Sequence, residues 1–229
     1  MGSLNPQALL GLLQISDSAF PTGAFAHSLG LEAFQAAGEL EGKEHLARAV
    51  SLHLEPMATS DCVALRAART AGSSEELVHA DRLLAATRPT RELRQASAAT
   101  GRRFAASVVA LGVEDELLRE FAGLSREGGT PGSLAVAHGV AARALGTGVE
   151  EALHAYLYAS AAALVAAGQK LIPLGGGAAQ RVLFELRGKI QTAVQDSERL
   201  EVEDMYTFAP LVDARSMQHE RQRVRLFVS

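Results

Sequence analysis

Residues 16–32 read SDSAFPTGAFAHSLGLE, and they interrupt a chain that otherwise has the spacing of alanine-rich amphipathic helices. Pro21 has no backbone N–H and disfavours the helical conformation at Phe20, so a preceding helix should end before this point. Thr22 has the side chain of a helix N-cap. We therefore expect a turn here, followed by a new helix over residues 24–37.

Within this expected helix, Phe25, Leu29 and Phe34 fall on one face. Ser28 and Glu32 are four residues apart, which makes them neighbours on another part of the surface. A polar turn flanked by phenylalanines has two interpretations. It docks the first helix against the body, or it forms a recognition surface.

Apolar residues recur at three- and four-residue steps along most of the chain, and no segment has the alternation of a strand. The pattern predicts an all-α protein, a single compact globular bundle of roughly nine or ten helices. Pro56 lies inside the apolar pattern of residues 42–71 and should kink or divide that helix. We expect a helical domain over residues 1–205 and a non-helical C-terminal tail over residues 206–229.

Length and composition narrow the class of protein. A chain of 229 residues fits one domain that buries a core without disulfides, and Cys62 is its single cysteine, so a reducing cytoplasm is the simplest location. The formal net charge of −4 argues against nucleic-acid binding. Residues 1–15 contain no lysine or arginine, unlike a secretory signal peptide. The apolar run at residues 155–167 is too short to span a bilayer, so we expect no membrane partner.

Motifs for catalysis or cofactor binding do not stand out in the sequence. Residues 175–177 are three glycines before a helix, but they lack the Lys-Ser/Thr ending of a phosphate-binding loop, so we interpret them as a helix–helix turn. Cys62 is interpreted as a buried structural thiol. His27 and Ser28 are adjacent and would diverge on a helix, which rules out a nucleophile–base pair. We expect no catalytic residue, no cofactor and no enzyme activity.

A metal site would draw on the histidines, none of which has His-x-His spacing: His27, His45, His53, His79, His138, His154 and His219. Structural zinc uses four ligands, and one cysteine cannot supply a thiolate set. His138 lies on an apolar stripe, where a hydrogen-bonded core histidine is the expected role. We expect no metal site within one subunit, although separated histidines can converge in a fold.

Two arginine-rich segments each have two interpretations. Arginines of residues 88–103 lie opposite an apolar stripe, which is typical of a solvated face and also suits docking to an acidic protein surface. The tail is either a frayed terminus or a segment that orders on a partner. Its apolar anchors and arginines are Met217, Leu226, Phe227, Arg215, Arg221, Arg223 and Arg225.

The stretch at residues 16–32 resembles the signature of the urease accessory protein F (UreF) family. Three further segments resemble the same family: residues 91–97 (RELRQAS), residues 171–175 (LIPLG), and residues 219–220 (HE) with residues 225–229 (RLFVS). They come in the order of the family and at about its spacing. The resemblance therefore covers nearly the whole chain.

This resemblance implies a cytoplasmic, non-catalytic scaffold for nickel insertion into apo-urease. Family members bind a second accessory protein, called D or H, and the complex recruits the nickel-carrying GTPase G; they also tend to form homodimers. The implied partner-binding residues in the signature are Asp17, Ser18, Phe20, Pro21, Gly23, His27, Ser28 and Glu32. Those in the tail are Arg215, Met217, His219, Glu220, Arg225, Phe227 and Ser229.

We expect the tail to be mobile alone and to order when the D/H protein binds, with Arg225 then contributing to the docking surface for the GTPase. Gly176 stands where the family commonly has Gln, so the contact of that Gln is in doubt here. One alternative is a nickel-binding metallochaperone or enzyme that holds the metal through His and carboxylate ligands. Another is a helical interaction domain unrelated to urease.

Overall fold

The structure is a computed structural model and describes residues 5–229. Within this range the regular elements are all helical, so the predicted all-α class is confirmed. In chain order they are α1 (Pro6–Ser16), the short 3-10 turn η1 (Ala24–Ala26), α2 (Leu31–Ala36), α3 (Lys43–Met57), α4 (Asp61–Thr70), α5 (Ser74–Thr87), α6 (Arg91–Ala110), α7 (Glu116–Glu127), α8 (Leu134–Ala144), α9 (Val149–Leu171), α10 (Gly176–Glu185), α11 (Arg187–Ser197), the 3-10 turn η2 (Val202–Asp204) and α12 (Pro210–His219).

The helices outnumber the nine or ten expected because several expected segments are divided. Pro56 does divide its helix as predicted, since α3 ends at Met57 and α4 begins at Asp61. The single helix expected over residues 24–37 was wrong. The backbone turns away between η1 and α2, where Leu29 has a φ of +53° and Gly30 a φ of +93°. These left-handed conformations cannot continue an α-helix.

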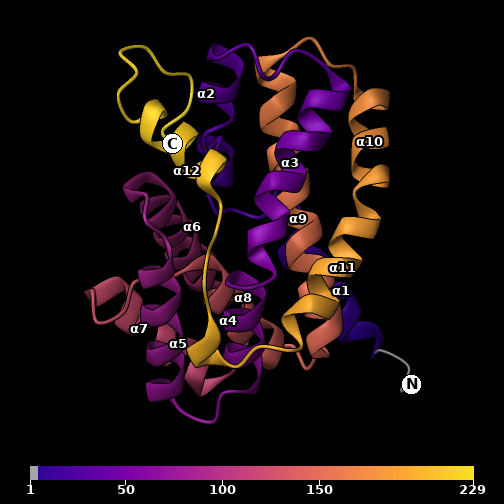
Figure 1. Cartoon of the computed structure of the whole chain (residues 1–229). Helices are drawn as coiled ribbons and strands as arrows, with labels where there is room; N and C mark the ends of the chain where they lie inside the picture. The colour runs from indigo at the N-terminus through magenta and orange to yellow at the C-terminus, as the bar shows by residue number, and fades with distance from the viewer. Residues whose placement is uncertain (1–4) are drawn as a thin grey trace.

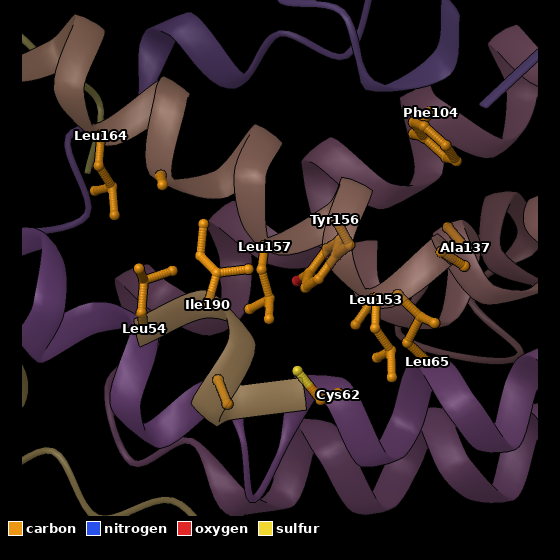
Figure 2. Close-up of a cluster of buried hydrophobic side chains, with 14 of the residues drawn as sticks. Leu54, Cys62, Leu65, Phe104, Ala137, Leu153, Tyr156, Leu157, Leu164 and Ile190 are labelled. Carbon is orange, nitrogen blue, oxygen red and sulfur yellow. The ribbon is translucent and has the colours of Figure 1, made fainter. Parts of the chain in front are cut away.

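Helix α9 lies at the centre of the fold and packs against α1, α2, α3, α4, α8, α10 and α11 (Figure 1). Its side chains Leu153, Tyr156 and Leu157 are buried in the core with Leu54 of α3 and Cys62 of α4 (Figure 2). Cys62 is buried, as predicted, and burial, reinforced by the neighbouring Asp61 carboxylate, raises the pKa of its thiol well above the ordinary value. The thiol is therefore protonated and unreactive at neutral pH.

Glycines allow α8 to lie very close to two neighbouring segments. A Cβ added at Gly139 would collide with the backbone carbonyl of Leu65 in α4, and one added at Gly101 in α6 would collide with the backbone just before α8. Only a residue without a side chain fits at such separations. The lower part of the molecule in Figure 1 is thus packed through backbone contacts as well as through side chains.

The C-terminal tail is not the non-helical segment expected from the sequence. Pro210 occupies the first turn of α12, where its missing N–H costs nothing, so it begins a helix and does not end one. The chain between η2 and α12 runs along the body from the lower end of the molecule to the upper end (Figure 1). It is held there by Tyr206, whose N–H donates to the carbonyl of Thr59 at 3.1 Å. Helix α12 then packs on α2, α3 and α6.

None of the helices described between residues 5 and 229 combines the length and the apolar character needed to cross a membrane.

Candidate functional site

The break between η1 and α2 forms a seat for the end of the tail. The backbone N–H groups of Ser28 and Leu29 donate to the carbonyl oxygen of Ser229 at 2.5 and 3.0 Å, and the Ser28 hydroxyl donates to the same oxygen at 3.0 Å. His27 Nδ1 lies 2.7 Å from Ser229 Oγ. The sequence predicted that His27 and Ser28 would diverge on a helix, and this was wrong. Both contact Ser229, which lies 202 and 201 positions away in the chain.

Glu32, in the first turn of α2, binds the tail from the other side. Its carboxylate accepts the backbone N–H of Leu226 at 2.7 Å, the backbone N–H of Phe227 at 3.1 Å and Nε2 of His219 at 3.1 Å. Burial acts to raise the pKa of this carboxyl, but the donors of Leu226, His219 and Phe227 outweigh it and lower the pKa below the ordinary value. A carboxylate that receives three hydrogen bonds stays ionised. Glu32 thereby joins α12, through His219, to the end of the tail at Leu226 and Phe227.

A second carboxylate, Glu92 of α6, completes a buried ionic cluster with Glu32, His219 and Arg225. His219 has no exposed surface, and its Nδ1 lies 2.8 Å from Glu92 Oε2. Arg225 Nη1 donates to Glu92 Oε1, also at 2.8 Å. The two carboxylates are bound at opposite ring nitrogens of His219, so they do not converge on one point as metal ligands would.

The remaining tail residues flank this cluster. Arg215 pairs with Glu39, with Nε 2.9 Å from Oε2, and Glu220 pairs with Arg91. The ring of Phe227 is buried, and Lys170 Nζ lies 5.4 Å from its centroid, within the range of a cation–π contact. Met217 is exposed and lies outside these contacts.

The first half of the signature contacts α6 and α1 and not the tail. Phe20 is buried with its ring 5.5 Å from that of Phe104, and the Pro21 carbonyl accepts the Ser107 hydroxyl at 3.4 Å. Gly23 has a φ of +75° and lies against the side chain of Arg103. Asp17 caps the turn by accepting the N–H of Ala19 at 2.7 Å, and Ser18 is exposed.

The two halves of the signature make different contacts. Residues 20–23 pack on α6, whereas His27, Ser28 and Glu32 hold the tail of the same chain. The recognition surface stays a prediction.

The docked end of the tail has two faces. Phe227 and Ser229 point inward and are buried, whereas Val224, Leu226 and Val228 are 88%, 65% and 66% exposed. The buried side chains thus bind the body, and three aliphatic side chains, here called the apolar stripe, are presented to solvent.

Sequence reasoning missed Glu92, Val224 and Val228 as site residues. Glu92 lies in the RELRQAS segment, but nothing in a sequence pattern pairs it with His219. The sequence could not single out Val224 and Val228 either, because Phe227 is also apolar and the pattern does not show which of these side chains is buried.

His138 is buried, as expected, but the expectation that it is hydrogen-bonded was wrong. Neither ring nitrogen has a hydrogen-bond partner in the part of the chain that the structure describes, and the ring stacks on Phe104 with centroids 5.1 Å apart. Burial lowers the pKa of His138 to about 4, so the ring is neutral at pH 7. It lines a cavity of about 110 Å³ between the signature turn and the alanine-rich face of α9.

No group of three or more His, Cys, Asp or Glu side chains suited to hold a metal ion occurs within residues 5–229.

Fold and site together define an all-helical protein in which a buried polar cluster joins its own tail to a turn near its N-terminus, next to exposed apolar side chains. Comparison with known sequences gives the family: the UreF family model matches residues 40–187. The chain belongs to the UreF family of urease accessory proteins.

Full-length relatives support the assignment. The chain is 37% identical to urease accessory protein UreF of Corynebacterium glutamicum strain R, over 95% of this chain and 96% of the relative. It is 34% identical to the UreF protein of Kocuria rhizophila and 36% identical to that of Paenarthrobacter aurescens, each over 96% of this chain and 97% of the relative. These alignments include the signature and much of the tail, which lie outside the residues matched by the family model.

Proposed function

We propose that the chain is a non-catalytic scaffold of urease maturation in the cytoplasm. It binds the D/H accessory protein through the docked tail, and the resulting complex recruits the nickel-carrying GTPase G for nickel insertion into apo-urease. The names of the relatives and the family membership support the role in maturation. The partner assignments rest on the family resemblance.

The observation that carries the proposal is the apolar stripe of Val224, Leu226 and Val228 on a segment fixed by hydrogen bonds to the family signature. Exposed aliphatic side chains gain free energy when a partner removes them from water. Because the backbone beneath them is already held, little conformational entropy is lost on binding. The stripe therefore has the properties of a preorganised docking surface.

In the structure the tail is packed against α2 and α6. We propose that the D/H protein binds the tail in this packed form, and mobility of the tail before that step stays a prediction.

Arginines next to the stripe suit the second step, recruitment of the GTPase. Arg221 and Arg223 are exposed, and the Arg225 side chain keeps 37% of its surface exposed while it binds Glu92. Guanidinium groups bind carboxylates in a bidentate manner, so an acidic surface on the GTPase would be complementary. We propose that Arg225 both fixes the tail and faces the GTPase.

A homodimer is part of the proposal, and helix α1 is the surface we assign to it. Its residues Leu9, Leu10 and Leu13 are exposed, and the helix contains no charged residue. If α1 forms the dimer interface, Leu10→Glu converts a dimer to a monomer in light scattering, whereas Tyr158→Glu, at an exposed position of α9, leaves the mass unchanged. Equal masses for the wild type and both variants would refute this assignment.

Co-purification tests the scaffold directly. The full-length chain should retain the D/H protein, and the GTPase should join only when the D/H protein is present. Failure of the folded chain to retain the D/H protein would refute the proposal. Unchanged GTPase recruitment by Arg225→Ala that still binds the D/H protein would remove Arg225 from the second step.

The alternative, a protein that holds nickel itself, makes a different prediction. Stoichiometric sub-micromolar nickel binding by this chain alone in equilibrium dialysis would favour it. The described side chains supply no cluster of three or more metal-binding groups, which weighs against a site within one subunit.

A further inference from the structure

We propose that His219 positions the tail as an imidazolium ion, so that docking of the tail surface is linked to the binding of one proton. This inference deepens the proposed function, because the docked tail is the surface assigned above to the D/H protein. The inference rests on three properties of the cluster formed by His219, Glu32, Glu92 and Arg225: its contacts, its charge balance and its burial. None of these properties involves a partner.

When both carboxylates are ionised, the contacts need a proton on each ring nitrogen. Nδ1 of His219 lies 2.8 Å from a Glu92 oxygen, and Nε2 lies 3.1 Å from a Glu32 oxygen. An ionised carboxylate only accepts hydrogen bonds, and a neutral imidazole donates from one nitrogen only. In the neutral form the other nitrogen would direct its lone pair at a carboxylate oxygen, with no exposed surface through which water could intervene. The imidazolium form donates to both.

With both carboxylates ionised, the charges of the cluster balance only in the same form. Glu32 and Glu92 carry two negative charges, and Arg225 supplies one positive charge through its contact with Glu92. A protonated His219 supplies the second and brings the total to zero. Without that proton, a net negative charge remains around a fully buried ring, which is unfavourable in a region of low dielectric.

Asp213 in the first turn of α12 is partly buried, which raises the pKa of its carboxyl, and it supplies no positive charge. Other charged groups around α12 are paired away from the cluster. On α12 and just after it, Arg215 pairs with Glu39 and Glu220 pairs with Arg91. On α3, His53 lies with its two nitrogens 2.7 and 2.9 Å from the carbonyls of Ala49 and Leu29. We therefore assign the second compensating charge, beside that of Arg225, to His219.

Glu32 transmits the state of His219 to the tail surface. The carboxylate that binds His219 Nε2 also accepts the N–H groups of Leu226 and Phe227. When His219 is neutral, repulsion turns one carboxylate away from the ring. Movement of Glu32 releases these two N–H groups, and the outward stripe loses its fixed position.

Nuclear magnetic resonance of the full-length chain, without a partner, tests this directly. With ¹⁵N-labelled histidine, both ring nitrogens of His219 should be protonated at pH 7. Above the pH at which this ring loses a proton, hydrogen-exchange protection of the Leu226 and Phe227 amides should fall about tenfold per pH unit, the slope for one linked proton. A His219 ring with one bare nitrogen at pH 7, beside protected amides, would overturn the inference. So would protection that stays constant up to the pH at which the helical body unfolds.

Three variants separate positioning by the proton from a merely structural role. In Glu92→Gln, the amide accepts from Arg225 and donates to the bare Nδ1 of a neutral His219, so tail protection should persist and lose its pH dependence. In His219→Phe, protection should be lost at every pH. His79→Gln is the control, because His79 forms an exposed pair with Glu203 and should leave the pH profile unchanged.

If His219→Phe fails to fold, Glu92→Gln decides alone: a pH profile identical to the wild type overturns the inference. Failure of the chain to bind the D/H protein, with the proton linkage intact, would refute only the proposed function. Loss of the linkage with D/H binding intact would refute only this inference.

Discussion

Arg225 and Glu92, 133 positions apart in the chain, form an ion pair in which Nη1 lies 2.8 Å from Oε1. The pair joins the last residues of the tail to the first turn of α6. The pair is exposed on one side only, since 37% of the Arg225 side chain but 8% of the Glu92 side chain is accessible. An ion pair in this setting contributes about 0–1 kcal/mol to global stability, so its main role is local.

The first prediction concerns this pair. Arg225→Ala should lower the exchange protection of the Leu226 and Phe227 amides by up to about fivefold, which corresponds to about 1 kcal/mol, with little change in melting temperature. Amide exchange followed by nuclear magnetic resonance measures the effect. Arg223→Ala, an exposed arginine two residues earlier, is the control and should leave protection unchanged. Equal effects of the two substitutions would contradict the assigned role of the pair.

The second prediction concerns substitution of Gly30, which has a left-handed backbone conformation and lies against α12. Its φ is +93°, and an added Cβ would lie 3.3 Å from the backbone nitrogen of Ser216. Gly38 has a φ of +73° and open space around it, so it isolates the backbone effect. Both Gly30→Ala and Gly38→Ala should destabilise the fold by about 1–2 kcal/mol in urea unfolding.

Only Gly30→Ala should also displace α12 and weaken binding of the D/H protein. A Gly38→Ala variant that weakens binding as much would show that general destabilisation, and not the α2–α12 contact, is responsible.

His138 gives a prediction for acid stability. The pKa of the buried ring is about 4 in the folded state against 6.5 for an unperturbed histidine, so the unfolded chain binds the proton first and stability falls as the pH drops from about 6.5 to 4. By pH 5 this costs about 2 kcal/mol, and below pH 4 about 3 kcal/mol. His138→Phe removes the titrating group and two buried nitrogens that lack partners, so it should be more stable than the wild type at pH 7 by about 1–3 kcal/mol.

Urea unfolding of the wild type and His138→Phe at pH 7 and pH 5 checks this. The advantage of the variant should grow by about 2 kcal/mol at the lower pH. A constant difference between the two proteins would show that His138 does not titrate as its burial implies.

The helical body could be predicted from sequence because helix periodicity and breakers act locally. Pro56 divides its helix as expected for a residue that removes a backbone hydrogen bond. The helix within the tail was missed because proline, which ends one helix, also suits the first turn of the next, as Pro210 does in α12.

The site was predictable only in part. The family resemblance named His27, Ser28, Glu32, His219 and Ser229, which the fold does bring together. It could not give their pairing, because the contacts join residues about 190–200 positions apart and several use backbone groups, such as the N–H of Leu226 bound by Glu32. Every residue except proline has a backbone N–H, so the residue type does not show which N–H binds a side chain. Ser18 and Met217, named by the same reasoning, are exposed and outside the cluster.

The central claim is that the outward face of the docked tail binds the D/H protein. Leu226 is 65% exposed, so Leu226→Glu should leave the fold intact while it places a charge in the middle of the apolar stripe. Leu111→Glu, at an exposed leucine at the C-cap of α6, is the matched control. The decisive measurement is the calorimetric affinity of the full-length wild type and both variants for the D/H protein. We predict that Leu226→Glu weakens binding at least tenfold, about 1.4 kcal/mol, and that Leu111→Glu does not. Equal affinities for all three proteins would contradict the account.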